Sequence, residues 1–240
     1  ANDVQEIDFY FDTMCPYAYQ TSLWIRDVRR QNNIKINWRF FSLEEINWEE
    51  GMMHPWEREV AWGWTPLRVA AYLRRTNMDD VDNWYAACGK ALHYDGRRPY
   101  EVETGKALLQ EIGLDPAIWD KALADPTTHD EVKADHDHAV TVLGAFGVPV
   151  ITAPGVRAMF GPVVLPAPTG DDAMELWEVT VRAAKFPGLY ELKRPKTKDD
   201  LKYIGAVFSP YFNAREWQTV MNPALLSLIH ISEPTRPERI

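Results

Sequence analysis

Cysteine is scarce in this sequence, which has only Cys15 and Cys88 among its 240 residues. One pair is no disulfide framework, and a chain of this length can bury a stable core without one. This usage indicates a reducing compartment. We therefore expect a cytoplasmic protein in which the reactivity of a thiol is the feature to explain.

Basic clusters and long apolar runs are also missing. The formal net charge is −9 and no block is rich in Lys and Arg, which argues against nucleic acid as a partner. The longest uncharged stretch, 139–156, is interrupted by glycines and prolines. Such a stretch would be a poor membrane helix, so we predict buried core there and no membrane span.

The N-terminal part has the pattern of a strand–helix–strand unit. Residues 4–12 alternate apolar and polar side chains and residues 34–41 are rich in β-formers, so both predict strands. Between them, apolar residues recur at helical spacing from Pro16 to about Arg30. Pro16 suits the first helical position, because its fixed φ fits and its missing N–H is not needed there. Cys15 is then expected at the helix cap.

The rest of the chain is predicted to be helical first and mixed afterwards. Helices are expected at 57–76, 80–94, 102–113, 116–124 and near 128–145. Strands at 147–151 and 157–164 and a helix at 170–185 are expected to follow. Residues 193–225 are predicted to be an irregular tail packed over the body. Residues 226–240 contain LSLIHISEPTR, which reads as translated sequencing adapter, so we exclude them from the fold.

Cys15 is the sharpest chemical feature because it stands where a strand passes into a helix. A helix N-terminus offers unpaired N–H groups and the positive end of the helix dipole, which stabilise a thiolate. We therefore expect a depressed thiol pKa and a nucleophilic cysteine. The alternative is that Cys15 is a small buried apolar residue that happens to follow a strand.

The motif Cys15-Pro16-Tyr17-Ala18-Tyr19, with the distant Val148-Pro149, resembles the DsbA-like branch of the thioredoxin-fold proteins. More closely, the chain is similar to actinobacterial DsbA-family proteins that include the mycothiol-dependent nitroreductase. The matching stretches are residues 21–25, 64–69, 160–163 and 190–194.

This resemblance implies an α/β fold, thioredoxin-like with a helical insertion. The expected parts are a thioredoxin-like domain at 1–45 and 129–195, the insertion at 46–128, a C-terminal extension at 196–225 and the adapter-derived residues 226–240.

One position departs from the redox-active relatives, which often carry Cys-Pro-x-Cys. Ala18 stands where their second cysteine would be, so Cys15 cannot close a disulfide with a neighbour. A single thiol can still form a mixed disulfide with a small thiol, which a second thiol molecule resolves. The Pro-Tyr-Ala-Tyr string is also similar to kappa-class glutathione transferases and chromene-carboxylate isomerases, which often have serine in the place of Cys15. Both similarities imply a small thiol as cosubstrate.

The resemblance also implies which residues bind the thiol and the substrate. Pro149 would follow a cis bond that faces the sulfur, and Val148 would offer its backbone to a ligand, although Val-Pro after glycine is by itself only a turn. The other expected members are Pro16, Tyr17, Asn47, Arg68 and His93.

Arg68 could hold a carboxylate and His93 could donate a proton. Equally, Arg68 could be a surface ion-pair partner and His93 a residue that ends a helix. Cys88 is expected to pack in the core, and no metal site is expected.

We predict a thiol-dependent oxidoreductase of the DsbA family in which Cys15 is the nucleophile. Mycothiol or glutathione would be the cosubstrate, with no tightly bound cofactor, and the substrate would be a disulfide or a small electrophile. Two alternatives stay open: a thiol-dependent isomerase or transferase, and a non-catalytic binding scaffold. A homodimer is also left open.

Overall fold

The computed structural model describes residues 2–215, so residues 226–240 and the end of the expected extension lie outside the described residues. A single four-stranded sheet, in the order β2-β1-β3-β4, is the frame of the described part. Its strands are β1 (Glu6–Phe11), β2 (Lys35–Phe40), β3 (Val150–Ala153) and β4 (Val156–Phe160). β1 pairs with β2 in parallel and with β3 in antiparallel, and β3 pairs with β4 in antiparallel.

Helix α1 (Pro16–Asn32) connects the two parallel strands, as the sequence predicts. In β2, Ile36, Trp38 and Phe40 are buried while the residues between them are more exposed. Helix α8 (Gly170–Lys185) packs on α1, where Trp24 and Trp177 meet with ring centroids 6.3 Å apart.

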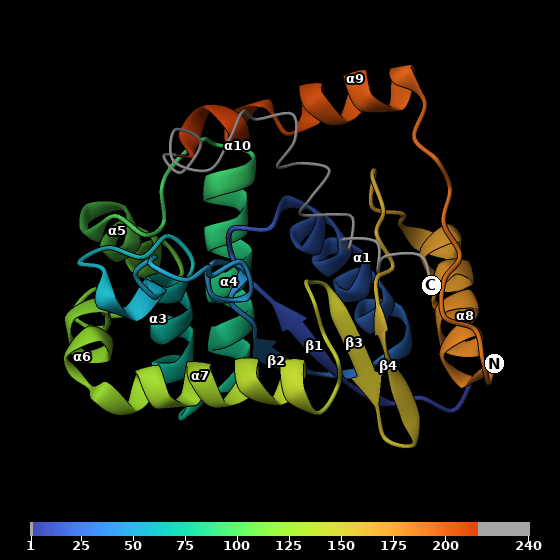
Figure 1. The fold of residues 1–240 in the computed structure, drawn as a ribbon, viewed down its shortest axis with the longest axis horizontal. Coiled ribbons are helices and arrows are strands. Elements are labelled where there is room, and N and C mark those ends of the chain that lie inside the picture. Colours follow the sequence, from blue (N-terminus) through green and yellow to red (C-terminus); the bar gives the residue numbers. More distant parts are fainter. Residues whose placement is uncertain (1, 216–240) are drawn as a thin grey trace.

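A block of helices follows β2 and lies beside that edge of the sheet, whereas α8 lies beside β4 (Figure 1). The block begins with α2 (Leu43–Ile46) and a 3₁₀ turn (Pro55–Glu57). Its remaining helices are α3 (Trp64–Arg74), α4 (Met78–His93), α5 (Val102–Glu111), α6 (Ile118–Ala124) and α7 (Pro126–Thr141). This arrangement is the predicted thioredoxin-type fold with helices inserted between its halves; the exact domain boundaries stay a prediction.

The expected helix at 57–76 begins later, at Trp64, and the cause is a buried carboxylate. Glu44 accepts hydrogen bonds from the backbone N–H groups of Trp62, Gly63 and Trp64, at 3.3, 2.9 and 3.0 Å. Side chains that accept the free N–H groups of a first turn fix where a helix starts. The capping residue here is distant in sequence, but Pro66 in the first turn was a local sign that the helix starts late.

The prediction that residues 193–225 are irregular is wrong for residues 198–214, although these residues do pack over the body, as expected. These residues form α9 (Lys198–Val207) and α10 (Ser209–Ala214). Thr197 and Asp200 form a capping box, in which each side chain accepts from the other residue's backbone N–H. This pairing is a sequence signature of a helix start. The two helices lie across the ends of α1 and α4 (Figure 1).

Candidate active site

Cys15 is the N-cap residue of α1, and Pro16 occupies the first helical turn, both as predicted. The backbone N–H of Ala18 donates to Cys15 Sγ at 3.4 Å, so the sulfur takes the place that a serine or aspartate oxygen usually fills at a cap. The backbone N–H of Cys15 donates to the carbonyl of Asp12 at 3.1 Å. The cap and this tight turn together fix the position of the sulfur.

A loop from the second half of the sheet reaches the same sulfur. The thiol of Cys15 lies 3.8 Å from the carbonyl oxygen of Val148, to which it can donate. The Val148–Pro149 peptide bond is cis. The N–H of Gly161 donates to the carbonyl of Pro149 at 2.9 Å, which ties this loop to the end of β4. The structure thus brings together Cys15, Pro16, Val148 and Pro149 from far apart in the sequence.

The C-terminal helices cover the thiol. Tyr17 packs edge-on against Phe208, with ring centroids 5.0 Å apart, and His93 packs against Tyr211 at 5.1 Å. Cys15 belongs to the same apolar cluster as these two aromatic residues of the C-terminal segment. As a result, the exposed fraction of Cys15 is 0%.

This burial reverses the expected pKa. Desolvation raises the pKa of Cys15 to about 12, and the charge of Asp12 acts in the same direction, while the backbone hydrogen bonds from Ala18 and Tyr17 lower it. A buried thiolate has lost the water molecules that stabilise its charge in solution. The hydrogen bonds and the dipole at one helix end do not compensate for that loss. The expectation of a depressed pKa is therefore wrong for this closed arrangement. The helix cap and a tail packed over the body were correctly predicted, but not that this tail packs in the cluster around Cys15.

Asp12 is a buried acid next to the thiol turn that the sequence analysis missed. Its two carboxylate oxygens accept from the N–H of Met14 at 3.1 Å and from the N–H of Leu43 at 2.8 Å. Burial raises its pKa to about 7, and Glu44 also raises it, whereas the two hydrogen bonds lower it. The signal available in the sequence was an aspartate at the end of a buried strand, directly before the cysteine turn. Its role is to join that turn to the start of α2.

His93, at the end of α4, is fully buried close to the cysteine turn. Its Nε2–H donates to the carbonyl of Thr13 at 2.9 Å, and its ring stacks on Tyr19 at 5.4 Å. Desolvation lowers its pKa to about 3, so the ring is neutral and Nδ1 carries a lone pair. Within residues 2–215, that Nδ1 has no hydrogen-bond partner.

Asn47 and Arg68 have local structural partners instead. Asn47 follows α2 and its side-chain amide donates to the carbonyl of Leu43 at 2.8 Å, within its own turn. The guanidinium of Arg68 donates to Thr128 Oγ1 at 2.9 Å and to the carbonyls of Leu123 and Asp125 at 3.1 and 2.9 Å. Arg68 thus binds the carbonyls at the C-terminal end of α6, which favours cations.

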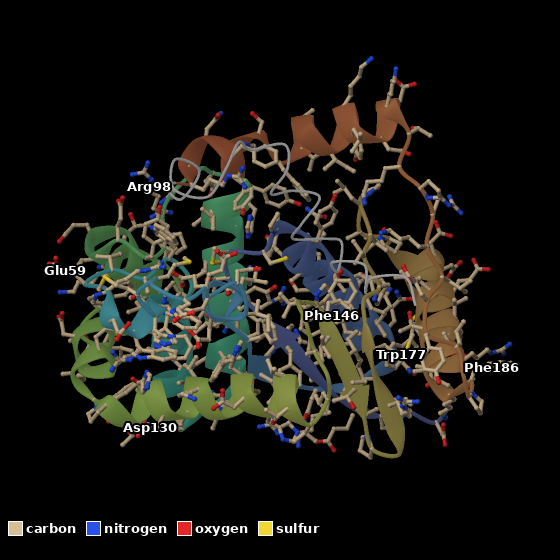
Figure 2. The ribbon with its side chains drawn as sticks, in the orientation of Figure 1. Glu59, Arg98, Asp130, Phe146, Trp177 and Phe186 are labelled. Carbon is tan, nitrogen blue, oxygen red and sulfur yellow. The ribbon has the colours of Figure 1, made fainter. Side chains whose placement is uncertain are left out.

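Arg68 also lines a cavity of about 190 Å³ in the helical block. Its walls include Trp56, Trp64 and Glu59, the last of which is labelled on the α3–α5 side of the molecule in Figure 2. Cys15 and His93 do not line it. The structure therefore separates Arg68 from the contacts around Cys15.

Cys88 is fully buried in the larger core cluster, as predicted. Desolvation raises its thiol pKa as well. Within residues 2–215, no three His, Cys, Asp or Glu side chains lie close enough together to hold a metal ion. No helix in that part of the chain is long and apolar enough to cross a bilayer.

Comparison with known proteins gives a family match and a close relative. Residues 14–194 match the model of the Rv2466c-like family, described as mycothiol-dependent nitroreductase Rv2466c. The match ends before α9, so α9 and α10 lie outside it. The uncharacterized protein Rv2286c of Mycobacterium tuberculosis (strain H37Rv) is 49% identical over 214 residues, which are 89% of this chain and 92% of the relative.

Solved structures with a similar fold are more distant in sequence. The cytosolic disulfide reductase DsbM from Pseudomonas aeruginosa, solved with GSH, has a TM-score of 0.55 at 14% identity, over 74% of this chain and 99% of that chain. The probable DsbA oxidoreductase SCO1869 from Streptomyces coelicolor has a TM-score of 0.53 at 18% identity, over 80% and 94% of the two chains. These similarities establish the DsbA-like fold of this chain.

Proposed function

Because this chain belongs to the Rv2466c-like family of mycothiol-dependent nitroreductases, we propose that it is a monothiol oxidoreductase that uses Cys15 and a small thiol. The observation that carries the proposal is the position of Cys15. Its sulfur caps α1 and faces the backbone carbonyl of Val148, with Ala18 in place of a second cysteine. We further propose mycothiol as the cosubstrate, because the family is described by its use of that thiol.

With a disulfide substrate, the reaction proceeds in three exchange steps. The Cys15 thiolate attacks one sulfur of the substrate, forms a mixed disulfide and releases the first substrate thiol. A reduced small thiol then attacks Cys15, joins it in a new mixed disulfide and releases the second substrate thiol. Another small thiol frees Cys15 and leaves as the oxidised dimer. Two small thiols have been oxidised and one disulfide has been reduced.

The surrounding residues have separate roles in this proposal. The Ala18 N–H bonds directly to the sulfur and favours the thiolate. Val148 offers its backbone to the group attached to Cys15, and Pro16 and Pro149 shape the two loops that meet there. Tyr17 forms an aromatic wall.

Asn47 and Arg68 have no role in this proposal, since their side chains already bind the turns and helix ends around them. The proposed cosubstrate acts only in its reduced form, and the cytoplasm keeps small thiols reduced, so we propose a cytoplasmic location.

Steady-state turnover tests the proposal directly. Wild type, Cys15→Ser and the matched control Cys88→Ser are mixed with reduced mycothiol and a small aromatic disulfide, and the release of substrate thiol is followed. We expect Cys15→Ser to fall to the uncatalysed rate, because the nucleophilic sulfur is gone, while Cys88→Ser keeps turnover. Equal activity of wild type and Cys15→Ser would overturn the proposal.

The same assay separates the alternatives. An oxidoreductase accumulates one oxidised mycothiol dimer for each disulfide reduced. An isomerase or transferase would need Cys15 but would leave the thiol without net oxidation. A binding scaffold would give neither product in any of the three proteins.

A further inference from the structure

The two cysteines are equally buried but for different structural reasons. Cys88 lies within the larger core cluster, among residues of the helical block and the sheet. Cys15 lies in the second cluster, which includes four residues of the C-terminal helices: Ile204, Phe208, Tyr211 and Ala214. No reagent can reach a sulfur with 0% exposure. Any reaction at Cys15 therefore requires one side of this cluster to move.

The C-terminal helices are joined to the body by an irregular, exposed connection. They follow residues 187–197, which form neither helix nor strand and are mostly exposed. Leu201 and Tyr203 on α9 are 46% and 47% exposed, so this helix has only one buried face. The last turn of α10 is tied to the body by Arg98, whose Nε–H donates to the carbonyl of Ala214 at 2.8 Å. Arg98 is labelled beside α10 in Figure 2.

The surface beneath these helices contains unsatisfied polar atoms. His93 stacks on Tyr211 of α10, and within residues 2–215 its Nδ1 and the hydroxyl of Thr13 have no hydrogen-bond partner. Both side chains are at most 1% exposed. Buried polar atoms are nearly always bonded. These two unpaired atoms next to the thiol can therefore bond to a polar ligand group once part of the present cover is displaced.

We propose that α9 and α10 form a lid over the site at which the small thiol meets Cys15. The lid is closed in this structure, and it opens about residues 187–197 to uncover Cys15, Tyr17, Thr13 and His93. This inference rests on the proposed function for the identity of the ligand, a small polar thiol. The opening itself is a property of the chain alone.

Labelling of the wild-type protein with iodoacetamide tests the lid, because Cys88 is an internal control. The labelling rate of each cysteine is measured by peptide mass spectrometry at increasing urea concentrations below the unfolding transition. Local opening exposes little surface, whereas global unfolding exposes much, so the two differ in denaturant dependence. We expect Cys15 to be labelled at least about tenfold faster than Cys88, with a weaker dependence on urea. Equal rates with the same urea dependence would overturn the lid.

A pair of variants then assigns the movement to these helices. Phe208→Ala removes the ring that contacts Tyr17, while the control Tyr203→Ala changes an exposed ring of the same segment. We expect Cys15 labelling to rise by about tenfold in Phe208→Ala and to change by less than about twofold in Tyr203→Ala, relative to Cys88. If Phe208→Ala leaves the ratio of Cys15 to Cys88 labelling unchanged, α9 and α10 are not the element that opens.

Turnover distinguishes a failure of the lid from a failure of the function. If opening precedes thiol binding, kcat/KM for mycothiol should rise in Phe208→Ala by about the same factor as Cys15 labelling. Selective labelling without any turnover would reject the oxidoreductase and leave the lid intact. Turnover with parallel labelling of the two cysteines would reject the lid alone.

Discussion

At the scale of single residues, Cys15 is subject to two opposing effects. A capping hydrogen bond and the helix end favour the thiolate, and both can be read from Cys15-Pro16 after a strand. Complete burial favours the neutral thiol, and it wins in the closed arrangement, where the pKa rises to about 12. The sequence predicts the first effect because it is local. The second depends on Phe208 and Tyr211, which no pattern near residue 15 reveals.

Asp12 gives a pH dependence that can be measured. Folding raises its pKa from 3.8 to about 7, so the folded chain binds more protons than the unfolded chain between those values. Stability contributed by protonated Asp12 is therefore lost as the pH rises through that window. The asparagine side chain of Asp12→Asn cannot titrate. Its NH₂ group faces one of the two backbone N–H groups that the carboxylate accepts from, so the variant loses one hydrogen bond. We expect the variant to be the less stable protein at low pH.

The predicted signature is the change of this difference with pH. From about pH 4 to about pH 8, wild type should lose on the order of 4 kcal/mol of unfolding free energy relative to Asp12→Asn. Urea denaturation at both pH values measures it, with the exposed Asp171→Asn as control. Parallel pH profiles for wild type and Asp12→Asn would show that the carboxyl titrates normally.

At the scale of elements, helix ends explain which predictions succeeded. The starts of α1 and α7 are marked by residues next to them, Cys15-Pro16 and Asp125-Pro126. α1 starts where expected, whereas α7 (Pro126–Thr141) starts and ends slightly before the expected 128–145. The start of α3 depends on Glu44, a distant carboxylate, and was placed too early. The start of α9 had a local capping box at Thr197 that was overlooked. The contact with Glu44 lay beyond what sequence reasoning could reach, although Pro66 marks the first turn of α3.

The start of α1 allows a direct test of the monothiol geometry. The Ala18 nitrogen lies 3.4 Å from Cys15 Sγ, one helical turn on, so a cysteine at position 18 should reach it with acceptable disulfide geometry. Oxidised Ala18→Cys should lose two hydrogens and hold added small thiol only briefly. Intact mass spectrometry after treatment with an oxidised small thiol follows both changes. A variant that keeps a long-lived adduct and never forms the internal bond would contradict the described cap.

At the scale of the whole molecule, the fold class was predictable and the cover over the thiol was not. The βαβ start, the run of helices and the late pair of strands follow from local patterning and from the family resemblance. The strand order β2-β1-β3-β4 was seen only in the structure. The contact between Cys15 and the Val148 loop depends on that topology, and the resemblance supplied it. The packing of α9 and α10 depends on apolar side chains whose partners lie in α1 and α4, which periodicity does not identify.

The central claim is that Cys15 alone exchanges with a small thiol. Wild-type protein is incubated with oxidised mycothiol, and the modified cysteine is located by peptide mass spectrometry. We predict one mycothiol adduct, on Cys15, that reduced mycothiol removes, while Cys88 stays unmodified in the core. An adduct on Cys88 with Cys15 free, or no adduct under conditions in which iodoacetamide labels Cys15, would contradict the account.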